Sequence, residues 1–141
     1  MNLLLLLGIA LLEPSSQQLP TPVEIRIPEY PEVAVKARMA DVVEVEESIS
    51  SDGAVATAVV IGKANPLLTA AALKAAREWR FAGDSGHATR KYVIRFEFTV
   101  DVDAAGKSEC PVGPPSVSLL LPLQTVRIRA WLRPGPPTVN Y

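Results

Sequence analysis

Residues 65–81, NPLLTAAALKAAREWRF, constrain the fold of this chain more than any other stretch. The side-chain oxygen of Asn65 suits a helix N-cap, and Pro66 suits the first helical position, where a missing N–H costs nothing. Apolar side chains recur at three- and four-residue steps, at Leu68, Ala72, Ala75 and Trp79. The pattern predicts an amphipathic helix. Its alanine-rich face would let it lie close to a sheet, with large anchors at both ends.

Two alternating segments before this helix predict an antiparallel hairpin, at residues 41–49 and 54–61. Asp52 and Gly53 between them supply the positive-φ conformations of a tight turn. In the first segment the glutamates at positions 44 and 46 fall on the wet face, whereas Glu47 falls among the apolar residues. We therefore expect Glu47 to need a partner such as an arginine.

A third strand follows the helix, because residues 90–100 place Tyr92, Ile94, Phe96, Phe98 and Val100 on one face. Earlier in the chain, residues 23–27 predict a short strand with Val23, Ile25 and Ile27 on its buried face. Because prolines flank it, it should lie at a sheet edge or run as an extended lead-in. Pro31 then predicts the start of a helix of about two turns. The order helix, strand, strand, helix, strand predicts an α+β fold. Its antiparallel sheet of three or more strands would carry two helices packed on one face.

Beyond residue 100 the alternation predicts one more hairpin. Residues 116–121 and 125–132 read as two short strands joined at Pro122, Leu123 and Gln124. If this hairpin adds to the sheet, it occupies the edge beside residues 90–100, and otherwise that edge stays free. The expected organisation is a targeting segment at residues 1–18, a domain at 19–100 and a C-terminal extension at 101–141.

Charge and composition exclude several classes of partner. A formal net charge of -1 without a Lys/Arg cluster gives no electrostatic footprint for nucleic acid or anionic lipid. The single Cys110 cannot form an internal disulfide, and with the single His87 it has no familiar metal-ligand spacing. Only Lys107 lies near Cys110, so the thiol lacks the setting of a reactive cysteine. Asp101 and Asp103 supply too few oxygens for a calcium loop. We expect no metal and no cofactor.

The residues capable of catalysis do not form a recognisable motif. Ser85, Gly86 and His87 combine a hydroxyl with an imidazole, but neighbours in sequence do not make a triad, and no strained elbow surrounds them. Trp79 and Phe81 fit a core better than a ligand platform, given their helical and strand-end positions. We expect a protein that is not an enzyme.

The start of the chain carries an apolar run at residues 3–12, about half of the roughly 20 residues that a membrane-spanning helix needs. Its length suits the apolar core of a secretory signal, and the polar residues 13–18 follow it. No Lys or Arg precedes the run and no small-x-small cleavage pattern stands out, so a buried N-terminal strand or helix is the alternative. Membrane contact is expected only through this segment, where it is not removed.

Short motifs follow one another in a recognisable order between residues 30 and 100. They are Tyr30-Pro31, Asp52-Gly53, Asn65-Pro66-Leu67-Leu68, Ala71-Ala72-Leu73, Trp79-Arg80-Phe81 and Phe96-Glu97-Phe98. The alanine helix led by Asn-Pro, ending in Trp-Arg-Phe before a strand with alternating aromatics, is the most specific part. In this order and spacing the motifs resemble the C-terminal domain of TonB, the periplasmic energy transducer.

The resemblance implies a small α+β domain that binds an extended peptide of an outer-membrane transporter by adding it to a free sheet edge. Unpaired backbone groups on such an edge give affinity, and flanking side chains give a preference among peptides. Carried over by position, the edge is the strand at residues 90–100 or the residues just after it. The expected contact residues are Lys91, Val93, Arg95 and Glu97. The implied location is the periplasm or cell envelope, with a link to energy-dependent transmembrane transport.

Two hypotheses follow from the length of the N-terminal spacer and from the C-terminal hairpin. About ten residues separate the apolar run from Val23, and such a spacer reaches at most about 35 Å when fully extended. It could not bridge two membranes, so we expect a stand-alone, exported TonB-like domain rather than a complete transducer. The alternative is a structural or assembly module of the envelope. In that case the hairpin closes the sheet edge or pairs two copies into a homodimer.

Overall fold

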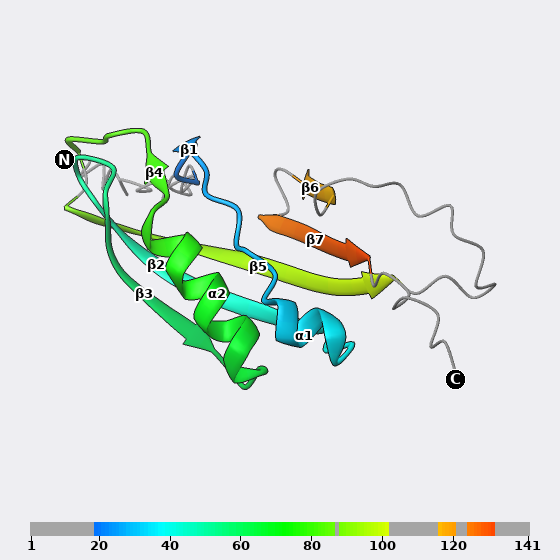
Figure 1. Ribbon diagram of the computed structural model, residues 1–141. Coiled ribbons are helices and arrows are strands. Elements are labelled where there is room, and N and C mark those ends of the chain that lie inside the picture. Colours follow the sequence, from blue (N-terminus) through cyan, green and yellow to red (C-terminus); the bar gives the residue numbers. More distant parts are fainter. Residues whose placement is uncertain (1–18, 87, 102–115, 121–123, 132–141) are drawn as a thin grey trace, which may run out of the picture.

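The computed structural model describes residues 19–86, 88–101, 116–120 and 124–131 (Figure 1). Its helices are α1 (Glu32–Lys36) and α2 (Pro66–Arg77). Its strands are β1 (Pro22–Glu24), β2 (Asp41–Ser50), β3 (Val55–Ile61), β4 (Arg80–Phe81), β5 (Thr89–Asp101), β6 (Ser116–Leu120) and β7 (Thr125–Trp131). No helix within the described ranges is long and apolar enough to cross a bilayer.

The main sheet has five strands in the order β3-β2-β5-β7-β6. Strands β3, β2 and β5 pair antiparallel, as do β6 and β7, whereas β5 and β7 run parallel. A separate small sheet joins β1 to β4. Both helices lie on the same face of the main sheet in Figure 1. The predicted α+β fold, with its antiparallel strands and two helices on one face, is confirmed, and a parallel pair extends the sheet.

The core lies between this face of the sheet and α2. Every second residue of β2, β5 and β7 points into it, which is why the sequence alternates. The largest fully buried side chains are Trp79, Phe96, Phe98, Ile49, Leu68, Ile94, Ile128, Glu47, Val43, Val45 and Val126. Burial of each large apolar side chain contributes about 1.5–3 kcal/mol. Aromatic rings meet edge to face in this core, with Trp79 and Phe96 at 6.4 Å between centroids.

Helix α2 begins as the sequence predicts. The side-chain oxygen of Asn65 accepts from the amide of Leu67 at 2.9 Å. The amide of Asn65 in turn donates to a carboxylate oxygen of Asp41 at 2.7 Å, which fixes the helix start to the start of β2. The helix ends at Arg77 rather than continuing to residue 81. Phe81 leaves the helix because its amide donates to the carbonyl of Gly53 at 2.9 Å.

The N-terminal lead-in differs from its prediction. Strand β1 spans only three residues, and Val23 and Ile27 are 65% and 53% exposed, so of the three expected buried residues only Ile25 packs against the core. Helix α1 has five residues rather than about two turns, and it buries Ala34 alone. Short polar and proline-containing segments of this kind are shaped by their tertiary contacts more than by their own periodicity.

Candidate functional site at the edge of strand β5

The backbone N–H and C=O groups of β5 point alternately toward β2 and toward β7. The amide of Arg95 donates to the carbonyl of Gln124 at 2.8 Å, on the β7 side. Because successive residues of a strand direct their N–H and C=O groups to opposite sides, Lys91, Val93 and Glu97 share the side of Arg95. All four predicted contact residues therefore present their backbone away from β2.

Strand β7 covers only part of this side. Its parallel register runs from Arg95 opposite Thr125 to Asp101 opposite Trp131. The pairing with β2 begins earlier, at Thr89 opposite Ser50. Within the described segments, β5 is therefore paired on both sides from Arg95 to Phe98, and Lys91 and Val93 precede the first β7 partner.

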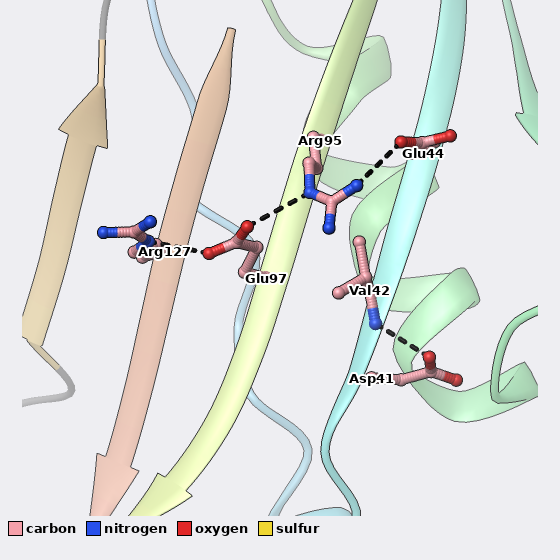
Figure 2. A network of polar contacts seen from close by, with 6 residues as sticks. All are labelled: Asp41, Val42, Glu44, Arg95, Glu97 and Arg127. Carbon is pink, nitrogen blue, oxygen red and sulfur yellow. Dashed lines mark hydrogen bonds and ion pairs between the residues drawn. The ribbon is translucent and has the colours of Figure 1, made fainter. Parts of the chain in front are cut away.

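The side chains of these residues lie on the face of the sheet opposite the helices, where a chain of ion pairs crosses three strands (Figure 2). Arg95 contacts Glu44 of β2 at 3.0 Å and Glu97 of its own strand at 3.1 Å. Glu97 also binds Arg127 of β7 at 2.7 Å. Lys91 pairs separately with Glu46 at 2.8 Å. The charges expected to receive a peptide are thus engaged within the sheet.

These ion pairs shift the pKa values of their members. Hydrogen bonds from Arg127 and then from Arg95 hold the pKa of the Glu97 carboxyl below its usual range. Hydrogen bonds to Glu97 and then to Glu44 raise the pKa of the Arg95 guanidinium. The side chains of Arg95, Glu44 and Arg127 are 42–55% exposed and that of Glu97 is 22% exposed, so each pair stabilises the fold only weakly. The network fixes side-chain positions more than it adds stability.

Glu47 is the exception that the sequence analysis singled out, and its environment differs from the expectation. It lies opposite Tyr92 of β5 and Ala58 of β3, fully buried on the helix-facing side of the sheet. Neither carboxylate oxygen has a hydrogen-bond partner in the part of the chain that the structure describes, so the expected arginine partner is not found. Burial raises the pKa of Glu47 to about 8. Burial, and then the Glu47 charge, raise the pKa of Tyr92.

The remaining candidates add no chemistry to this edge. Trp79 and Phe81 are core residues, 1% and 3% exposed, and the Trp79 indole N–H donates to the carbonyl of Arg26 at 2.8 Å. Asp101 pairs with Arg129 at 3.1 Å. The described ranges hold no cluster of side chains that could bind a metal. The expectations for His87, Asp103, Lys107 and Cys110 fall outside the described residues.

A groove that the sequence does not predict lies between α2 and residues 26–31. It has a volume of about 660 Å³. Its lining includes Ile27, Pro28 and Leu67, with Lys74 and Glu78 at its margin. The groove lies between segments that are separated in sequence, so a local sequence pattern cannot predict it. Its lining is mostly apolar, so it resembles a binding groove more than an acid–base site.

Comparisons with known proteins gave a family match and a similar solved structure. The family model described as Gram-negative bacterial TonB protein C-terminal matches residues 26–100, the region whose motifs carry the resemblance. The search of curated proteins gave no match. Among solved structures, the solution NMR structure of the Pseudomonas aeruginosa TonB CTD is similar at 23% identity and a TM-score of 0.49, covering 59% of this chain and 88% of that chain. The matched region includes α1, β2, β3, α2 and nearly all of β5, and this chain therefore belongs to the TonB C-terminal domain family.

Proposed function

We propose that this protein binds an extended segment of an outer-membrane transporter, or of another envelope protein, by pairing it with the first half of β5. One observation carries the proposal. The backbone of Lys91 and Val93 faces away from β2, and the pairing of β5 with β7 begins only at Arg95. A guest strand pairing with these two residues would gain main-chain hydrogen bonds without requiring a particular sequence.

Arg95 and Glu97 have a different role in this proposal. Their backbone groups face β7, so they would contact a guest through side chains alone. Each already forms two ion pairs, and a charged guest would have to share or replace one of them. This arrangement favours peptides whose charges add to the network, such as an acidic residue near Lys91 or Arg95.

A titration followed by backbone amide shifts tests the binding site. Transporter-derived peptides should move the amides of Lys91 and Val93 more than those of Tyr92 and Ile94, which face β2. Val93→Pro removes one outward N–H and should weaken binding about tenfold or more, whereas Val93→Thr keeps that N–H and should bind as the wild type does. Shifts that avoid Lys91 and Val93 would refute this site.

The cellular setting forms part of the same proposal. We place the protein in the periplasm or cell envelope, with residues 1–18 as the export signal, and assign it a non-enzymatic role linked to energy-dependent transport. Mass spectrometry of the N-terminus of protein recovered from a Gram-negative periplasm tests export. An intact residue 1 in protein confined to the cytoplasm would contradict it.

A second candidate function is an envelope assembly module without a peptide guest. The parallel pairing of β7 with β5 from Arg95 to Asp101 favours it, because the chain itself fills this part of the edge. Under this hypothesis the same titration gives no shift at Lys91 or Val93 with any transporter peptide. The β6–β7 hairpin then serves as a permanent cap.

A further inference from the structure

The buried carboxyl of Glu47 and the side chain of Arg90 occupy neighbouring positions on the helix-facing side of the sheet, and no ion pair joins them. We infer that they form a pH-sensitive switch. When the Glu47 carboxyl loses its proton, the Arg90 side chain leaves the carbonyl of Ala82 and pairs with Glu47 instead. The inference does not depend on a peptide guest, because neither residue is among those proposed to pair with one.

The pairing of β2 with β5 brings the two side chains within reach of each other. Glu47 lies opposite Tyr92, and Ile49 lies opposite Arg90. Because every second residue of a strand points to the same side, Arg90 shares the face of Tyr92 and is a diagonal neighbour of Glu47. Diagonal neighbours are about 7–8 Å apart, a distance that a long side chain can span. Arg90 can therefore reach Glu47 by rotation about its side-chain bonds.

Both side chains have buried polar atoms without a partner. Glu47 is 0% exposed, and neither of its carboxyl oxygens is hydrogen-bonded in the described part of the chain. The Nε of Arg90 is also buried and donates to no described group, whereas its Nη2 donates to the carbonyl of Ala82 at 2.7 Å. Each buried polar atom that lacks a partner costs stability. A contact between Glu47 and Arg90 would satisfy the carboxyl and the Nε together.

Arg90 is the only cation placed to stabilise an ionised Glu47 among the described residues. The groups around Glu47 and Tyr92 are Ala58 of β3, Phe81 of β4, Gln124 before β7 and the buried residues of α2, which are Leu68, Ala72, Ala75 and Ala76. Of these groups only Tyr92 titrates, and it is not a cation. Burial is accordingly the cause of the raised Glu47 pKa.

Ionisation of Glu47 changes which acceptor Arg90 prefers. A protonated carboxyl is neutral and competes poorly with the Ala82 carbonyl for the guanidinium. A carboxylate attracts the guanidinium strongly in a low-dielectric interior, and the hydrogen bond is then charged on both sides. An unpaired buried carboxylate is also far more costly than an unpaired carbonyl. The ionised state therefore favours the pair of Glu47 with Arg90.

The switch changes how the small sheet of β1 and β4 is held. Ala82 follows β4, and its amide donates to the carbonyl of Thr21 at 2.8 Å. The hydrogen bond from Arg90 to the Ala82 carbonyl ties this region to β5. When Arg90 turns to Glu47, the tie to β5 is lost, whereas the bond from the Phe81 amide to Gly53 persists. The segment around Ala82 is therefore held less firmly at high pH.

A carbon-13 NMR titration of the Glu47 carboxyl in the full chain tests the pairing. Arg90→Gln removes the cation and should raise the pKa of Glu47 by about 1 pH unit or more relative to the wild type. Arg90→Lys keeps a positive charge and should restore part of the difference. Arg77→Gln is the matched control, because Arg77 is exposed on α2, and it should leave the pKa unchanged. An unchanged pKa in Arg90→Gln would overturn the inference.

The Nε–H resonance of Arg90 reports the switch without a change to Arg90 itself, so it decides the case in which the Arg90 variants do not fold. In the wild type this resonance should shift with pH at the midpoint of the Glu47 titration. In Glu47→Gln, where the side chain cannot ionise, the shift should be absent. A wild-type resonance that stays constant through the Glu47 titration overturns the inference, as does an equal shift in Glu47→Gln.

Amide exchange separates the release of one contact from a general loosening of the fold. Above the Glu47 midpoint, the amide of Ala82 should exchange faster in the wild type by a larger factor than the amide of Ile94, which lies in the middle of β5. Glu47→Gln should show no such difference between the two amides. Equal acceleration of both amides in the wild type would mean that ionisation destabilises the whole sheet, and that result would also overturn the switch.

Discussion

Glu47 links the stability of this protein to pH. Its carboxyl is buried among apolar side chains, and that burial raises its pKa from 4.5 to about 8. In the unfolded chain the group titrates near its ordinary value, so between these values the folded state holds a proton that the unfolded state has released. Below this window the carboxyl is protonated in both states, so its ionisation takes nothing from the stability of the fold. Its contribution to the free energy of unfolding falls as the pH rises through this window.

Glu47→Gln should remove this decline. The wild type should lose on the order of 1 kcal/mol of unfolding free energy per pH unit between about pH 4.5 and 8 through this group, and the glutamine variant should lack that component. Urea unfolding at several pH values measures it. Glu46→Gln is the control, because Glu46 lies on the opposite face and pairs with Lys91. Equal slopes for the wild type and Glu47→Gln would contradict the prediction.

Glu47 also shows which properties of a residue a local sequence pattern can predict. Alternation along residues 41–49 correctly assigns Glu47 to the buried face, because side-chain direction depends only on the strand. Its lack of a partner depends on other strands. The Arg90 side chain turns to the carbonyl of Ala82 at 2.7 Å, and Arg95 turns outward to Glu44 and Glu97. The sequence of residues 41–49 cannot predict which groups the side chains of Arg90 and Arg95 contact.

At the scale of elements, the turn between β2 and β3 depends on a close contact with β4. Gly53 has φ of +89°, and a Cβ added there would lie 1.9 Å from the carbonyl oxygen of Phe81. Gly53→Ala must therefore push β4 away as well as strain the backbone. We expect a loss of more than about 3 kcal/mol in the free energy of unfolding, measured by urea denaturation.

Gly62→Ala is the matched control for this turn. Gly62 also has a positive φ, +79°, but an added Cβ would meet no atom within 4 Å. Only the backbone strain remains, and we expect a loss of about 1–2 kcal/mol. Similar losses for the two variants would show that the contact with Phe81 carries little energy.

The elements that the sequence predicts correctly are those with local signals. Helix α2 has its cap at Asn65 and an apolar repeat, and the hairpin of β2 and β3 has its turn residues. The end of α2 and the pairing of β1 with β4 escape prediction, because both depend on contacts between Thr21–Glu24, Gly53 and Phe81 across the chain. The four expected contact residues on β5 rest on family resemblance, and their binding role stays a prediction.

For the whole molecule, the arrangement of β7 is the feature that the sequence leaves most open. The alternation in residues 125–131 predicts which side chains are buried, and Val126, Ile128 and Ala130 are indeed in the core. It cannot specify a neighbour or a direction, because parallel and antiparallel strands share the same period. In the structure the parallel register with β5 places Val126, Ile128 and Ala130 beside Phe96, Phe98 and Val100.

Because β7 joins the domain through one strand of the sheet, the β6–β7 hairpin should be separable from it. Ile128→Asp places an unpaired carboxylate at a position that is 1% exposed, and we expect it to undock the hairpin. Amide exchange should then accelerate about tenfold or more at Arg95 and Glu97, which face β7, and less at Phe96, which faces β2.

Undocking the hairpin should also change binding, because the free edge of β5 would extend from Lys91 to Asp101 and transporter peptides would pair with more residues. Isothermal titration of the Ile128→Asp variant should give a lower Kd than the wild type. Arg127→Ala is the control, since it removes an exposed ion pair with Glu97 but keeps the buried face of β7. Uniformly faster exchange throughout β5 and β2 would instead mean that the hairpin and the domain unfold as one unit. In that case the variant would not offer a folded domain with a free β5 edge to a peptide.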